Sequence, residues 1–139
     1  MLDLKLSPKE TALDNEPAEV VIHDRDGNAY DDGNGNPTIF LVLGEYSDAV
    51  RAYDRAETNR NLKRRARDTT ADADTLEDAV VNRLSVAVVG WKNVADDGKP
   101  APFSTEGVKA ILRAMPWTRN DVAKGMVEHS GFFAKPSGT

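Results

Sequence analysis

Acidic and amide side chains alternate near the N-terminus as they do in calcium-binding loops. Asp24, Asp26 and Asn28 would place oxygen ligands at the first, third and fifth positions of an EF-hand loop. Such a loop also needs glycine at the sixth position and glutamate at the twelfth, where this chain has Ala29 and Gly35. The surrounding residues are mostly Gly, Asn and Asp, which are typical of turns. We therefore interpret this run as a solvated loop and predict no metal site.

Other motifs that carry chemistry are also incomplete. Gly98 and Lys99 precede Pro100, where a phosphate-binding loop has Ser or Thr. His23 and His129 stand outside any His-Glu-x-x-His motif, and no Gly-x-Ser-x-Gly motif occurs. The chain has no cysteine, which excludes a thiol nucleophile and a disulfide framework. We therefore expect neither enzyme activity nor a cofactor.

A basic segment stands out in a chain whose net charge is -5. Between residues 51 and 67, seven basic residues accompany two acidic ones, so this segment carries +5 and the rest of the chain -10. The overall acidity makes nucleic-acid binding an unfavoured role. We expect this segment to contact an acidic patch on a protein partner or on another copy of the chain, and a solvated helix face is the alternative. The candidate contact residues are Arg60, Lys63, Arg64, Arg65 and Arg67.

The elements that position these residues form an α+β pattern. The β-branched run at 20–22 and the apolar run at 38–43 predict two strands that pair as an N-terminal antiparallel hairpin. Because a lone hairpin is only marginally stable, about four α-helices that follow must cover one of its faces. We predict a single domain over residues 1–134, with flexible segments at 1–17 and 135–139.

Four segments have the periodicity or the capping residues of helices. The first runs from Ser47 toward Arg67 and has a thin apolar stripe. The second, Leu76–Trp91, has the clearest amphipathic pattern. Ser104 or Thr105 begins the third, and Thr118 begins the fourth. Two aromatic residues close the predicted core: Phe132 and Phe133.

No segment has the composition of a membrane span or a signal peptide. The most apolar stretch, residues 76–94, is interrupted by charged residues and falls short of the ~20 apolar residues that a span needs. The first seven residues alternate polar and apolar side chains. We therefore expect a cytosolic protein with no membrane partner.

Three blocks of sequence follow one another along nearly the whole chain. The first combines 19–27 with 38–48, the second is 88–94, and the third runs from 102 to 108 and leads through 115–117 to Gly131-Phe132-Phe133. In order and spacing, these blocks resemble the tail assembly chaperones of long-tailed bacteriophages and prophages. The chaperones that the chain resembles are those encoded just before the tape measure protein.

This resemblance implies a protein without catalysis that coats the helical tape measure protein before the tail tube polymerises. It also implies self-association, action in the host bacterial cytoplasm and absence from the mature virion. A groove could shield the apolar surface of such a partner, and we predict that the helices 76–91 and 108–115 line it. The predicted contact residues, for which a place in the core is the alternative, are Leu84, Val88, Trp91, Ile111, Leu112 and Met115.

Two other functions remain open from the sequence. A structural virion subunit, such as a tail-completion or head–tail connector protein, would have the same size and the same tendency to self-associate. A nucleic-acid-binding regulator would use the basic helix, and its binding would weaken with salt.

Overall fold

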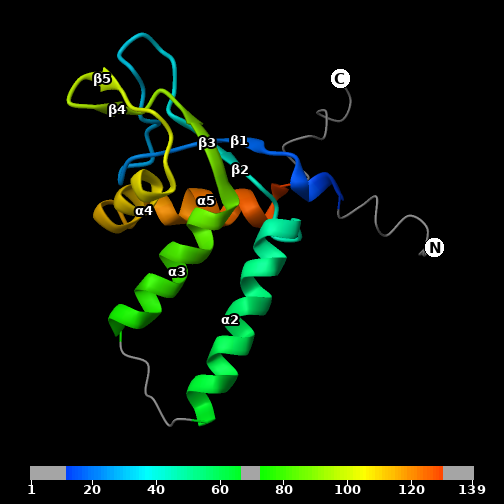
Figure 1. The fold of residues 1–139 in the computed structure, drawn as a ribbon. Helices are drawn as coiled ribbons and strands as arrows, with labels where there is room; N and C mark the ends of the chain where they lie inside the picture. The colour runs from blue at the N-terminus through cyan, green and yellow to red at the C-terminus, as the bar shows by residue number, and fades with distance from the viewer. Residues whose placement is uncertain (1–11, 67–72, 130–139) are drawn as a thin grey trace.

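The computed structural model describes residues 12–66 and 73–129 (Figure 1). In chain order, its elements are η1 (Leu13–Asn15), β1 (Ala18–Val21), β2 (Ile39–Val42), α2 (Asp48–Ala66), α3 (Ala73–Ala87), β3 (Val88–Lys92), β4 (Ala95–Asp96), β5 (Lys99–Pro100), α4 (Thr105–Ala114) and α5 (Thr118–Val127). The predicted α+β class, with an N-terminal antiparallel hairpin followed by four helices in the described residues, is confirmed. Within these residues, no helix is both long and apolar enough to cross a membrane.

The main sheet has three antiparallel strands, with β2 between β1 and β3. Phe40 is the centre of its register, because it pairs with Val20 on β1 and with Trp91 on β3. Phe40 and Val42 are fully buried, whereas Ile39 and Leu41 on the opposite face are only partly covered. This alternation shows that the helices pack on one face of the sheet.

The predicted helix Leu76–Trp91 is wrong in its last turn. The helix ends at Ala87, and Val88–Lys92 form strand β3 instead. The two β-branched valines of this segment favour a strand, and Gly90 disfavours a helix. The open edge of β2 supplies a partner for their backbone groups, and the Ala87 carbonyl accepts a hydrogen bond from the Leu43 N–H at 2.8 Å. Tertiary pairing therefore overrides the helical periodicity.

The long loop between β1 and β2 uses its carboxylates to build turns. Asp24 accepts hydrogen bonds from the backbone N–H groups of Asp26 and Asn28, both at 2.9 Å. Asp32 plays the same role further along and accepts from the Asn34 N–H at 2.8 Å. A side-chain hydrogen bond from Asn36 lowers the pKa of Asp32 below 3.8. These acidic residues therefore stabilise the loop itself.

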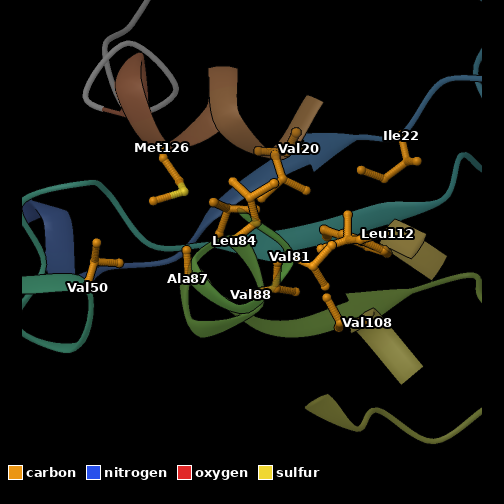
Figure 2. Close-up of a cluster of buried hydrophobic side chains, with 13 residues drawn as sticks. Val20, Ile22, Val50, Val81, Leu84, Ala87, Val88, Val108, Leu112 and Met126 are labelled. Atoms are coloured by element: carbon orange, nitrogen blue, oxygen red, sulfur yellow. The ribbon is translucent and has the colours of Figure 1, made fainter. Parts of the chain in front are cut away.

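The core lies between the sheet and helices α3, α4 and α5. Figure 2 shows side chains from β1, α3, β3 and α4 gathered in one cluster. Buried Val, Leu and Ile dominate it, which agrees with the low aromatic content of the chain. The cluster consists of Val20, Ile22, Phe40, Val42, Val50, Val81, Leu84, Ala87, Val88, Val108, Leu112, Val122 and Met126.

The two ends of the described chain meet beside this core. The buried carboxylate of Asp14 accepts a hydrogen bond from the Tyr46 N–H at 2.9 Å. The buried His129 ring contacts the Glu16 carbonyl oxygen at 2.5 Å through Nε2. Asp14, Asn15 and Glu16, within the expected flexible segment 1–17, have hydrogen-bond partners in the structure, while 1–11 and 135–139 lie outside the described residues. Phe132 and Phe133, which we expected to close the core, also lie outside them.

Strand β1 and helix α5 approach each other closely at Gly125. A Cβ atom at this position would lie 2.6 Å from Cγ2 of the buried Val20. We expect Gly125→Ala to lower the free energy of unfolding by about 1–3 kcal/mol, because overpacking outweighs the helix preference of alanine. Urea denaturation measures this change. In a Val20→Ala background the same substitution should cost nothing, and an undiminished cost there would contradict the contact.

Candidate partner-binding surface

Helices α2 and α3 project together from the sheet and form an arm (Figure 1). We call residues 48–66 and 73–87 the α2–α3 arm. At 1.5 Å per residue, the 19 residues of α2 extend about 28 Å. The two helices run antiparallel, so the end of α2 and the start of α3 lie at the tip of the arm. The arm is therefore the part of the fold that offers the most helix surface to a partner.

The inner half of the arm is well held. Val50 is fully buried, and its backbone N–H donates to the Ser47 hydroxyl at 3.3 Å. Arg83 of α3 donates two hydrogen bonds to the carboxylate of Asp54 on α2, at 2.8 and 3.0 Å. The hydrogen bonds to the Asp54 carboxylate raise the pKa of Arg83 above its ordinary value. This bidentate pair fixes the register of α2 against α3.

The other side of α3 is tied to the body of the protein. Glu77 pairs with Arg119 of α5 at 2.6 Å, and Asp78 pairs with Arg113 of α4 at 3.2 Å. Exposed ion pairs of this kind contribute little to stability, so their value here is to orient the helix. With one side directed to α4 and α5, the side that carries Arg83 is left to face α2.

The outer half of the arm leaves apolar side chains uncovered. Leu62, Leu76 and Val80 are 57%, 60% and 48% exposed, and we call them the exposed arm residues. Leu76 and Val80 share one side of α3 with Arg83, because residues three and four apart stack on a helix. Counting outward from the Asp54–Arg83 pair, Leu62 and Leu76 both lie about two turns away. The α2-facing side of α3 is therefore apolar and largely open.

A hollow of about 450 Å³ opens at the base of this same side. It is lined by residues of α2, by the loop before α2 and by Arg83 of α3, namely Glu45, Tyr46, Arg51, Asp54, Arg55, Thr58 and Arg83. Arg51, Arg55, Thr58 and Leu62 recur at helical spacing, so the α2 wall of the hollow continues outward to Leu62. The basic hollow and the exposed arm residues thus form one continuous surface, which we call the arm surface.

The cations of the arm surface are incompletely neutralised. Asp54 forms an ion pair with Arg83, and Glu57 forms one with Arg60, whose Nη1 lies 2.5 Å from the Glu57 Oε1. Within the described part of the chain, Arg51, Arg55 and Lys63 make no ion pair. Of the predicted electrostatic residues, Arg60 and Lys63 are exposed on α2, Arg64 and Arg65 lie in its last turn, and Arg67 lies outside the described residues.

Most of the six predicted apolar contact residues lie elsewhere. Leu84, Val88 and Leu112 are buried in the core, so they hold the fold together and are not open to a partner. Trp91 packs against two phenylalanine rings. Its ring centroid lies 6.1 Å from that of Phe40 and 5.3 Å from that of Phe103. Its indole N–H donates to the Ala101 carbonyl at 2.9 Å, which completes a structural role.

Ile111 and Met115 do line a surface hollow, of about 290 Å³, between the β1–β2 loop, residues 93–95 after β3, and α4. Polar groups in and around this hollow form hydrogen bonds with neighbouring residues of the protein. The Tyr30 hydroxyl contacts the Met115 sulfur at 3.8 Å and accepts a hydrogen bond from the Trp117 indole at 3.1 Å. This hollow is smaller than the one at the base of the arm, and the one charged side chain among its lining residues is Asp31, whose carboxylate accepts a hydrogen bond from the Gly33 N–H at 2.9 Å.

Tyr53 links the stability of the arm to pH. Burial raises the pKa of the half-buried Tyr53 above 10.0, and the nearby Glu57 carboxylate adds to this effect. Because the folded-state pKa is raised, the contribution to stability is complete below pH 10.0 and is lost as the pH rises through the folded-state pKa. We expect Tyr53→Phe to weaken this alkaline loss in thermal unfolding. If the thermal stability of the variant fell with pH as steeply as that of the original chain, Tyr53 would not be the source of the alkaline loss.

Fold and surface together define a small α+β protein that presents a helical arm with an uncovered apolar and basic side. Residues 45–131 match a family model described as YdaY prophage protein. This match covers more than half of the chain, and the protein belongs to this family. The matched residues include the whole α2–α3 arm. No curated protein and no solved structure matches the chain.

Proposed function

We propose that this prophage protein is a tail assembly chaperone, which binds the tape measure protein and keeps it soluble during tail morphogenesis without catalysing a reaction. The observation that carries the proposal is the arm surface, where Leu62, Leu76 and Val80 remain exposed on a helix pair that the fold does not cover. Membership of a prophage family supports the phage context. The resemblance of the sequence blocks to tail assembly chaperones supports the choice of partner.

The physical basis is helix-to-helix recognition. A tape measure protein that exposes a long apolar stripe would aggregate unless other apolar side chains cover the stripe. Each Leu or Val side chain that leaves water on binding contributes about 1.5–3 kcal/mol. One arm gives only a modest contact, so several copies bound along one partner would hold it by multivalency. Self-association of the chain belongs to the same proposal.

The proposed site of action is the host bacterial cytoplasm, before the tail is complete. A chaperone of this kind leaves as the tail tube forms, so the mature virion should lack it. A structural virion subunit would instead remain in the particle. Mass spectrometry of purified particles therefore separates the two functions.

Co-expression with the tape measure protein of the same prophage tests the proposal. We expect the partner to move from the insoluble to the soluble fraction and to elute with several copies of this chain. Pull-down and size-exclusion light scattering measure the complex and its stoichiometry. A partner that still precipitates, beside a free monomer of this chain, would overturn the chaperone function and favour the virion subunit.

A further inference from the structure

We propose that the segment recognised by the arm surface is an acidic amphipathic α-helix. This inference rests on the proposed function and specifies the kind of partner segment. Its apolar stripe would contact Leu62, Leu76 and Val80 in the outer half of the arm. Its acidic side chains would lie against Arg51 and Arg55 in the basic hollow.

The shape of the arm surface favours a helix as the occupant. The two antiparallel helices place the stripe of α2 that ends at Leu62 beside the side of α3 that carries Leu76 and Val80. The Asp54–Arg83 pair holds the helices in register. Leu62 and Leu76 lie at one level beyond this pair, and Val80 lies between that level and the pair. A third helix that packs along α2 and α3 would cover all three apolar side chains at once, as in a helical bundle. An extended strand would find no free sheet edge here, because the arm is entirely helical in the described residues.

The charge of the arm surface favours an acidic occupant. In the hollow, Asp54 is already paired with Arg83, so Glu45 is the other acidic residue among the described lining residues, beside Arg51 and Arg55. Lys63, which makes no ion pair with a described residue, adds a further cation toward the tip. Placing lysines or arginines of a partner beside these groups would cost energy through like-charge repulsion, whereas glutamates or aspartates would be attracted. The surface therefore selects for charge as well as for an apolar stripe.

Two synthetic peptides provide the test with the full chain and without the tape measure protein. Both are about three heptads long with Leu at the a and d positions, and the remaining positions are mostly Glu in one peptide and mostly Lys in the other. Fluorescence anisotropy should show the acidic peptide binding at least about tenfold tighter. The difference should shrink in 1 M salt, where the Debye length falls to about 3 Å.

Charge-reversed variants locate the effect. The double variant Arg51→Glu and Arg55→Glu should lose the preference for the acidic peptide or invert it. A matched control, Lys99→Glu with Lys124→Glu, changes the net charge equally at exposed positions off the arm and should keep the preference. Circular dichroism verifies that both variants are folded.

Several results would overturn the inference. These are equal affinity for the two peptides, a preference that survives reversal of Arg51 and Arg55, or tighter binding of a DNA duplex than of either peptide. If the chain captures the tape measure protein but does not discriminate between the peptides, only this inference fails. If it selects the acidic peptide but never captures the tape measure protein, the chaperone function fails and the preference for an acidic helix stands.

Discussion

Replacing Leu76 and Val80 by glutamine should weaken binding of the tape measure protein by at least about tenfold while the chain stays folded. Both side chains are about half exposed, so their loss should change stability by only about 0.5 kcal/mol each. Full burial of an exposed Leu or Val contributes about 1.5–3 kcal/mol, so each of these half-covered side chains would lose about half of that at the interface. Together that is about 1.5–3 kcal/mol, and every 1.4 kcal/mol is about tenfold in affinity. Biolayer interferometry with the immobilised partner measures the change.

A matched substitution separates this effect from a general loss of surface apolarity. Val127 is 65% exposed at the end of α5, off the arm. Val127→Gln should therefore leave the affinity within about twofold of the starting value, because changes at positions outside an interface are close to neutral. Equal losses in the arm variant and in this control would show that the arm is not the binding surface.

Phe40→Ala should lower the free energy of unfolding by about 3–5 kcal/mol, the usual cost of removing a buried phenylalanine. Phe40 is 0% exposed, lies at the centre of β2 and pairs with Trp91 across the sheet. Its truncation leaves a cavity under all three strands, which the rigid sheet cannot fill. Because a domain of this size is stable by only about 5–15 kcal/mol, this loss is a large share of the total. Urea denaturation followed by tryptophan fluorescence measures it.

Phe103 provides the comparison for this substitution. It also packs against Trp91, with ring centroids 5.3 Å apart, but it is 38% exposed. Phe103→Ala removes the same atoms from a site that water already reaches, so we expect a loss of about 1 kcal/mol. If both variants lost the same stability, the buried sheet centre would not be the main source of the effect.

The sequence predicts the fold class because its local signals agree with the tertiary structure in most places. The β-branched run before the Gly- and Asn-rich loop does form β1, and the capping residue Ser104 does begin α4, with its hydroxyl accepting from the Gly107 N–H at 2.9 Å. The signals fail at 88–92, where helical spacing continues from α3. The two valines favour a strand there, and the edge of β2, which is distant in sequence, supplies the partner that makes this segment a strand.

The proposed binding surface was harder to predict from the sequence for a related reason. Periodicity places Leu76, Val80, Leu84 and Val88 on one stripe, and it cannot say where along that stripe burial stops. In the structure, Leu84 is buried in the core and Val88 is part of β3, while Leu76 and Val80 are exposed on the arm. One signal was available in the sequence. The stripe of α2 that would cover them becomes polar after Tyr53, so the outer half of the arm could not bury its own apolar residues.

Hydrogen–deuterium exchange of the chain, alone and bound to the tape measure protein, tests binding at the arm most directly. We predict slower exchange of the backbone amides in the outer half of α2 and in α3 when the partner is present, because a third helix would suppress local opening there. The amides of β2, which are already buried in the sheet centre, should change little. Protection confined to the hollow around Ile111 and Met115, or no protection on the arm, would contradict the proposed binding surface.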